Sequence, residues 1–279
     1  MTTLKTILKT AKARLQHASP SASLDADLLL CHVLDVGRTY LVAYDDRILT
    51  PDEIAAYETL LQRREAGEPI AYIRGYQPFY DRDFIVTADV LIPRPETEHL
   101  LETALDYAKT QSMIRAVDVG TGSGILAVTF AAHTPDAEVH AIDISPAALT
   151  VARQNADKHD VQIQFHEGNL AAPLLQSGQK FNLIMANLPY IASDEIPDLA
   201  VSQHEPHLAL DGGGDGLRLI ETLLEQCVPL CDPGAMILLE IGYEQGAACI
   251  ALAEHILSPQ KVDIIKDLAG HDRIVRILY

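Results

Sequence analysis

The sequence predicts an α/β protein in which a doubly wound parallel sheet, covered by helices on both faces, follows a small helical bundle and a β-hairpin. Three patterns support this prediction. Apolar residues recur at helical spacing near the amino terminus, short runs rich in Tyr, Phe, Ile and Val come next, and strand-like and helix-like segments then alternate. Strands separated by helices of about 10 to 15 residues are typical of parallel sheets.

The first predicted domain, residues 1–68, is a helical bundle. Residues 4–15 and 24–33 carry apolar side chains three or four positions apart, as expected for helices with one buried face. Residues 50–53, Thr-Pro-Asp-Glu, combine a capping box with proline in the first helical position. This combination marks the start of a further helix.

Residues 69–93 are predicted to form an extended β-hairpin that links two domains. Their Tyr, Phe, Ile and Val runs are broken by Gly75, Pro78 and Asp81, which are typical turn residues.

The second predicted domain, residues 94–279, contains the parallel sheet. We expect a helix from near Glu96, then strand 114–119, helix 123–133, strand 138–143, helix 146–158, strands 161–166 and 181–186, helix 216–230, strand 235–241, helix 244–257, and strands 261–266 and 273–278. Ligands of such sheets bind beyond the carboxyl ends of the strands.

Charge and composition exclude several classes of function. The net charge is −18, and residues 91–279 contain 11 basic and 26 acidic side chains. An acidic domain disfavours direct binding to nucleic acid. No apolar run is long enough to span a bilayer and no secretory signal is visible, so we expect a cytoplasmic protein. The four cysteines and the His204, Glu205, His207 group lack metal-site spacing, and no metal is expected.

A glycine-rich loop follows the first strand of the second domain. Gly120, Gly122 and Gly124 would let the chain turn sharply and let a ligand approach the following helix. The dinucleotide fingerprint requires glycine at the sixth position of the loop, where Ile125 stands. The carboxylate of Asp118, just before the loop, would repel a pyrophosphate and attract an ammonium or sulfonium group. S-adenosylmethionine has both cations and no phosphate.

Polar residues also end the next two strands. Asp143 is placed to accept hydrogen bonds from two ribose hydroxyls, Asn169 to bind adenine, and Leu170 to pack on the adenine face. The predicted cofactor-binding residues are Asp118, Gly120, Thr121, Gly122, Ser123, Gly124, Asp143, Asn169, Leu170 and Asn187.

The fourth strand ends in Asn187, Leu188, Pro189 and Tyr190, the predicted catalytic and substrate-binding tetrapeptide. The Asn187 side-chain oxygen and the Leu188 carbonyl can accept the two N–H bonds of a planar NH2 group. Pro189 would hold the turn, and Tyr190 would pack on the flat face of the substrate. These residues suit methyl transfer to an amide or amino nitrogen, with rate enhancement from orientation and electrostatics.

The sequence resembles the glutamine methyltransferases of class 1 peptide chain release factors, known as PrmC or HemK. The Pro-Arg-Pro-Glu-Thr-Glu run at residues 93–98 is the most specific match. Others lie at residues 67–75, 79–80, 91–92, 205–206, 209–210, 213–217, 240–242 and 272–273. The likeness covers nearly the whole chain.

This resemblance implies a Rossmann-like, seven-stranded methyltransferase sheet with an antiparallel last strand, and an amino-terminal domain that recognises the substrate. The implied substrate is the glutamine of the Gly-Gly-Gln motif of a release factor. Arg94 and Glu96 are then expected near the substrate entrance or in a salt bridge between domains. Two positions depart from the family pattern, because Leu188 replaces proline and Asn169 replaces aspartate.

Two other substrates fit the same acceptor pair: a glutamine of a ribosomal protein, and the exocyclic amine of adenine in RNA. The acidic second domain and the Pro-Arg-Pro run disfavour RNA.

Overall fold

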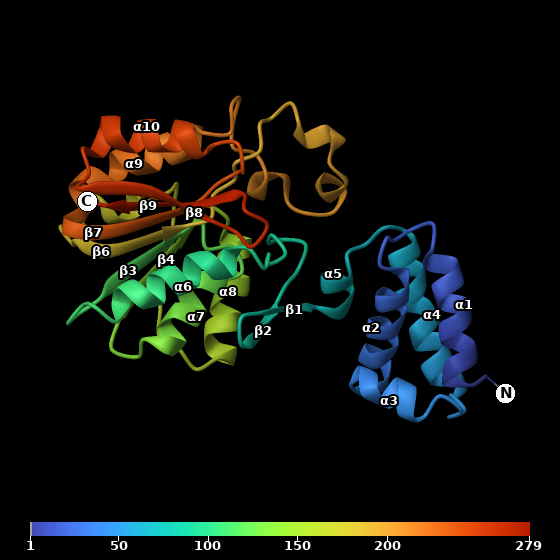
Figure 1. Cartoon of the computed structure of the whole chain (residues 1–279). Coiled ribbons are helices and arrows are strands. Elements are labelled where there is room, and N and C mark those ends of the chain that lie inside the picture. Colours follow the sequence, from blue (N-terminus) through green and yellow to red (C-terminus); the bar gives the residue numbers. More distant parts are fainter. Residues whose placement is uncertain (1) are drawn as a thin grey trace. The chain divides into compact units, whose positions relative to one another are not determined.

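The computed structural model describes residues 2–279 and divides the chain into two compact units, Met1–Tyr76 and Gln77–Tyr279 (Figure 1). The division lies within the segment expected to link two domains.

The first unit is a helical bundle. Its helices are α1 (Leu4–Leu15), α2 (Ala22–Leu34), α3 (Arg38–Ala43), α4 (Pro51–Glu65) and α5 (Ile70–Arg74). The capping box predicted at the start of α4 is present, with Thr50 and Glu53 bonded to each other's backbone. The buried Tyr57 hydroxyl donates to the Ala26 carbonyl at 3.0 Å and ties α4 to α2.

The predicted hairpin is shorter than expected. Strands β1 (Tyr76–Phe79) and β2 (Arg82–Ile85) pair with each other, but residues 70–74 are helical and not extended. Gly75, at φ 76°, ends α5 in a left-handed conformation that favours glycine. The extended expectation for this part of the linker was therefore wrong, because a short apolar run fits a buried helical turn as well as a strand.

The second unit contains a seven-stranded sheet, as the resemblance implied. Its order is β5-β4-β3-β6-β7-β9-β8, and β9 runs antiparallel to both of its neighbours. The strands are β3 (Arg115–Val119), β4 (Glu138–Asp143), β5 (Gln164–Glu167), β6 (Phe181–Ala186), β7 (Cys231–Glu240), β8 (Lys261–Lys266) and β9 (Asp272–Leu278). Strand β5 is shorter than the predicted strand 161–166 and β7 begins earlier than predicted.

Helices cover both faces of this sheet. In Figure 1, α9 (Arg218–Leu230) and α10 (Gly246–Leu257) lie on one face, while α6 (Thr97–Ala108), α7 (Ile125–His133) and α8 (Pro146–Lys158) lie on the other. Two buried clusters fill these layers: one includes Leu223, Leu224 and Ile237, and the other includes Leu101, Phe130 and Leu183. The near-continuous burial of the central strands is typical of sheets covered on both sides.

The strand order reverses at the centre of the sheet. Strand β3 pairs in parallel with β4 on one side and with β6 on the other. Connections from these strands therefore leave toward opposite faces, and a crevice opens where their carboxyl ends meet.

The segment between β6 and α9 has structure that the sequence analysis did not predict. Three short 3-10 helices, η2 (Ile196–Asp198), η3 (Ala200–Gln203) and η4 (His207–Ala209), fold it over the carboxyl edge of the sheet. A bridge between Ile191 and Asp211 closes this loop.

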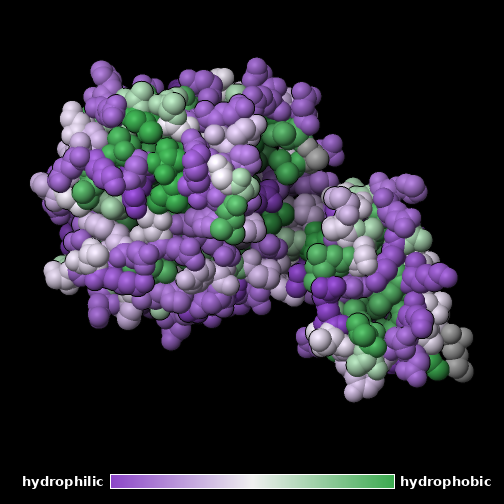
Figure 2. All heavy atoms as spheres, in the orientation of Figure 1, coloured by the Kyte–Doolittle hydropathy of each residue, from purple (hydrophilic) through white to green (hydrophobic). Residues whose placement is uncertain are grey.

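Hydrophilic residues cover most of the visible surface, and hydrophobic residues appear there in separate patches (Figure 2). Within residues 2–279, every helix is too short or too polar to cross a membrane.

Candidate active site

A cavity of about 250 Å³ opens at the carboxyl ends of β3, β4 and β6. All of its lining residues belong to the second unit. They come from the segment before α6, the glycine loop, the ends of β4 and β5, the turn after β6, and the loop that contains η4. The expected cofactor residues Asp118, Gly120, Thr121, Gly122, Ser123, Asp143, Asn169, Leu170 and Asn187 all line it, while Gly124 does not.

The three loop glycines have different physical roles. Each has positive φ, at 76° for Gly120, 55° for Gly122 and 84° for Gly124. A Cβ on Gly120 would lie 2.9 Å from Leu188 Cδ2, and one on Gly124 would lie 3.2 Å from the Ala152 Cβ of α8. A Cβ on Gly122 would meet nothing within 4 Å. Gly120 and Gly124 therefore allow close packing, and Gly122 leaves space open at the cavity.

Asp143 connects the ends of two strands to the glycine loop. Its carboxylate accepts from the Gly122 N–H at 2.8 Å and from the Ser145 N–H at 2.9 Å. Burial raises its pKa, and the backbone bonds oppose that rise. The Ile144 N–H is a third backbone donor to this carboxylate. Two carboxylate oxygens have about four lone-pair sites, so the group keeps acceptor capacity for a ligand hydroxyl.

Asp118 lies beneath the glycine loop and is only 1% exposed. Its Oδ2 accepts from the Thr121 hydroxyl at 2.6 Å and from the Ala127 N–H at 3.2 Å. Its Oδ1 is buried without a hydrogen-bond partner. Burial raises the pKa of this carboxyl to about 7. A buried carboxylate with a free oxygen is suited to a cationic ligand, because only a positive charge would compensate its desolvation.

Asn169 and Leu170 lie at the far side of the cavity. Leu170 is mostly buried and has positive φ, 51°, which is uncommon for a residue with a branched side chain. The following Ala171 N–H donates to Gln226 Oε1 at 2.7 Å and anchors this turn to α9. The apolar Leu170 surface and the Asn169 amide are thus adjacent, as a purine ring would require.

The turn after β6 is only partly as expected. Asn187, Leu188 and Pro189 line the cavity, but Tyr190 is not among its lining residues. The Tyr190 carbonyl instead accepts from Gln245 Nε2 at 3.0 Å. Its backbone therefore anchors the turn to Gln245 at the start of α10. The packing of Tyr190 on the substrate stays a prediction.

Two glycines in the loop before α9 contact the backbone of the turn after β6. A Cβ on Gly212 would lie 2.7 Å from the Pro189 carbonyl oxygen, and one on Gly216 would lie 2.2 Å from the Tyr190 carbonyl oxygen. Only glycine allows the two backbones to approach this closely. Residues 213–217 are one of the runs that match the family, but their spacing did not predict this contact.

The packing of Leu188 explains how leucine can stand where the family pattern has proline. Its side chain is 4% exposed and packs against Gly120. The leucine therefore joins the turn after β6 to the glycine loop, while its carbonyl remains part of the cavity-lining backbone.

The Asn187 side chain is held by two groups that the sequence analysis did not identify. Its Nδ2 donates to the Thr97 hydroxyl at 3.1 Å. The Glu240 carboxyl, 2% exposed at the end of β7, is next to both side chains: burial raises its pKa to about 7, and the interactions with Thr97 and Asn187 oppose that rise. Thr97 and Glu240 lie in sequence runs matched to the family, yet nothing in their spacing showed that they meet.

Arg94 and Glu96 have different positions. Arg94 lines the cavity and its guanidinium contacts Glu205 Oε1 at 2.5 Å. Glu205 is buried and its other oxygen accepts from the Ile92 N–H at 3.0 Å. This ion pair joins two segments of the second unit. Glu96 precedes α6 at its N-cap position and does not line the cavity.

Comparisons with known proteins identify the family of this chain. The family model described as the PrmC N-terminal domain matches residues 6–75, and one described as a methyltransferase domain matches residues 110–224. The chain is 40% identical over 276 residues to the release factor glutamine methyltransferase of Koribacter versatilis, covering 98% of this chain and 97% of that protein. It is 37% identical to the Bacillus subtilis enzyme of the same name, covering 99% and 97%.

Solved structures support the fold. A methyltransferase from Pyrococcus furiosus has a TM-score of 0.53 at 17% identity, covering 79% of this chain and 96% of that one. A Thermus thermophilus 16S rRNA N2 G1207 methyltransferase, solved with AdoMet and guanosine, has a TM-score of 0.52 at 14% identity, covering 73% and 49%.

The residues of the cavity fit S-adenosylmethionine. The unpartnered Asp118 oxygen suits a cation, the open side of Gly122 admits a ligand, and Asp143 retains acceptor capacity for hydroxyls. The chain belongs to the release factor glutamine methyltransferase family, and it is an enzyme that uses S-adenosylmethionine.

Proposed function

We propose that this enzyme methylates the side-chain amide nitrogen of the glutamine in the Gly-Gly-Gln motif of class 1 peptide chain release factors. The observation that carries the proposal is the position of Asn187 and Leu188. Both line the cavity beside the cofactor loop. In the proposal, the Asn187 side-chain oxygen and the Leu188 backbone carbonyl accept from one NH2 group.

The chemistry follows from that acceptor pair. When bound, S-adenosylmethionine supplies an electrophilic methyl group. The Asn187 oxygen and the Leu188 carbonyl hold the amide nitrogen of the substrate so that its weak lone pair faces the methyl carbon. As the new carbon–nitrogen bond forms, the carbon–sulfur bond breaks and the nitrogen loses one proton to solvent. The enzyme needs no strong base, since the methylated nitrogen is acidic.

The proposed contacts divide among the lining residues. We assign the methionine ammonium to the neighbourhood of Asp118, the ribose to Asp143, and adenine to Asn169 and Leu170. Substrate contacts are assigned to residues 187–189 and to Arg94, which lines the same cavity. The helical first unit, residues 6–75 of which match the PrmC N-terminal domain, is proposed to recognise the body of the release factor.

Three acceptors distinguish this proposal from its rivals. The protein is incubated with labelled S-adenosylmethionine and with a class 1 release factor, the same factor with its Gly-Gly-Gln glutamine changed to alanine, or ribosomal particles. We expect label in the unchanged factor only. Label in ribosomal RNA or in a ribosomal protein, or label that survives the glutamine change, contradicts the proposal.

A further inference from the structure

Glu240 is a buried acidic side chain that the proposed reaction does not yet use. It ends β7, is 2% exposed, and one of its oxygens, Oε2, has no hydrogen-bond partner. A carboxylate buried in this way costs stability, and an apolar side chain would suit the neighbouring core better. Stability therefore does not explain why glutamate stands here.

The register of the sheet places Glu240 beside the catalytic turn. Ala186 of β6 pairs with Leu239 of β7, so the next residues along these parallel strands, Asn187 and Glu240, are neighbours. Thr97, the first residue of α6, is fully buried against both side chains. Three elements distant in sequence thus meet behind the acceptor amide.

We infer that Glu240 and Thr97 are positioning residues that orient the Asn187 amide with its nitrogen inward and its oxygen toward the substrate glutamine. This inference rests on the proposed function. The Asn187 nitrogen has two N–H bonds and faces two acceptors, the Thr97 hydroxyl oxygen and the Glu240 carboxylate. Its oxygen remains free for the N–H of the substrate.

The opposite orientation of the amide is disfavoured by Glu240. A carboxylate only accepts, and because it also accepts from the Thr97 hydroxyl, that hydroxyl oxygen is left as an acceptor. Rotation by 180° would place the Asn187 oxygen against the Glu240 carboxylate and leave both N–H bonds facing the substrate NH2, which would then meet donors in place of an acceptor. Burial raises the Glu240 pKa to about 7, while Thr97, Arg273 and Asn187 oppose the rise. At pH 8 the carboxylate form, which only accepts, predominates.

The test uses pairs of variants that match in size and differ in hydrogen bonding. Glu240→Leu and Thr97→Val remove the acceptors, whereas Glu240→Gln and Thr97→Ser each keep one. Thr129→Val is the control for Thr97→Val, because the Thr129 hydroxyl is also buried but has no hydrogen-bond partner. Each variant is assayed at pH 8 with a release factor, together with its thermal unfolding and its affinity for S-adenosylmethionine.

We expect kcat to fall about tenfold or more in Glu240→Leu and Thr97→Val, with KM and cofactor affinity within about threefold of wild type, because the rest of the release factor still binds. Glu240→Gln, Thr97→Ser and Thr129→Val should stay within about threefold of wild-type kcat. A merely structural role would lower kcat in step with the melting temperature and would not be rescued by Gln or Ser.

Unchanged kcat in either acceptor-removing variant overturns the inference, as does equal loss in both members of a pair. If Glu240→Leu does not fold, the Thr97 pair and its Thr129 control decide the result. Failure of the proposed function is a separate outcome, because the wild-type protein would then transfer no methyl group to the release factor glutamine.

Discussion

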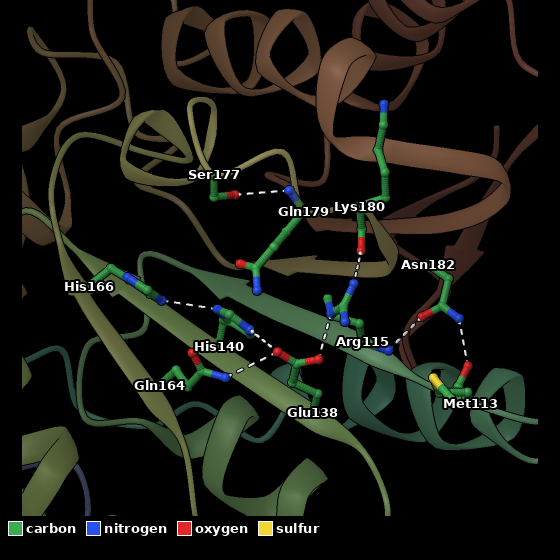
Figure 3. A network of polar contacts seen from close by, with 10 residues as sticks. All are labelled: Met113, Arg115, Glu138, His140, Gln164, His166, Ser177, Gln179, Lys180 and Asn182. Atoms are coloured by element: carbon green, nitrogen blue, oxygen red, sulfur yellow. Dashed lines mark hydrogen bonds and ion pairs between the residues drawn. The ribbon is translucent and has the colours of Figure 1, made fainter.

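Two polar regions of the sheet differ in how completely their side chains are paired. Figure 3 shows the first region, a network of paired side chains on β3, β4, β5 and the start of β6. Glu138 accepts from Arg115 Nε at 2.6 Å and contacts His140 Nε2 at 3.1 Å, and His140 Nδ1 lies 3.0 Å from His166 Nε2. Asn182 bridges the Arg115 N–H and the Met113 carbonyl.

At the carboxyl ends the buried carboxyls of Asp118 and Glu240 each have an oxygen without a partner. Both have a pKa raised to about 7 by burial. The paired network around Glu138 and His140 stabilises the folded chain. Unpaired acceptors such as those of Asp118 and Glu240 reduce stability and favour a ligand that donates hydrogen bonds or positive charge to them. Among the described residues, the two buried carboxyl oxygens without a partner both lie beside the site. Substitutions in the two regions should therefore have different effects.

The largest expected effect comes from the two asparagines of one strand. Asn187→Ala removes the acceptor oxygen at the carboxyl end of β6 and should abolish measurable turnover, while cofactor affinity stays within about tenfold. Asn182→Ala, at the amino end of the same strand, removes two backbone bridges. It should lower the free energy of unfolding by about 1 to 2 kcal/mol and leave kcat unchanged. Turnover by Asn187→Ala comparable to that of Asn182→Ala would remove the functional distinction between the ends.

Next in size is the backbone support of the catalytic turn. Gly216→Ala places a Cβ 2.2 Å from the Tyr190 carbonyl oxygen at a φ of 72°, so the turn must move. We expect kcat to fall by about a hundredfold. Gly234→Ala is the matched control, since its φ is 86° but its Cβ would meet nothing within 4 Å. Equal kcat values in the two variants would mean that backbone strain, and not the contact with Tyr190, is responsible.

Asp118→Asn tests how the unpartnered Asp118 carboxylate affects cofactor binding and stability. We expect S-adenosylmethionine to bind about tenfold or more weakly, because a buried negative charge is lost. Since the folded-state pKa is raised from 3.8 to about 7, the native protein holds the proton at pH values where the unfolded chain has released it. Wild-type stability at this group therefore falls as pH rises from about 4 to above 7.

The asparagine side chain has no carboxyl to titrate, so the Asp118→Asn variant does not lose stability as the pH rises from about 4 to above 7. Its free energy of unfolding relative to wild type should therefore increase across this pH interval, by a few kcal/mol at most. Chemical denaturation at pH 5 and pH 8 measures the difference. A constant difference between the two pH values would contradict the assignment of a raised pKa to Asp118.

The smallest effect on stability is expected for His166, in the paired network of Figure 3. Burial, and then the charge of His140, lower the pKa of His166. A histidine with a lowered folded-state pKa contributes stability above its unfolded pKa of about 6.5, and this contribution is lost as pH falls through the folded value. His166→Gln should cost about 1 kcal/mol at pH 8 and less at pH 5.5, with no change in kcat. A larger cost at the acidic pH would contradict this account.

The sequence by itself determined the local features of this protein. Apolar periodicity predicted the helical bundle and most strands and helices of the sheet domain. The glycines at 120, 122 and 124 and the turn after β6 were identified because their positions follow directly from strand ends. Asp143, Asn169 and Leu170 were likewise placed beside the cavity, since the carboxyl ends of parallel strands share one edge.

The tertiary structure alone decided the contacts between segments distant in the chain. Local spacing contained no sign that Thr97 and Glu240 meet Asn187, or that Glu205 pairs with Arg94. It also did not show that the cavity lining would end at Pro189, before Tyr190. Such contacts depend on strand register, on the path of the loop over the carboxyl edge, and on how closely two backbones can approach. These are properties of long-range packing, in which residues dozens of positions apart become neighbours only when the sheet has formed.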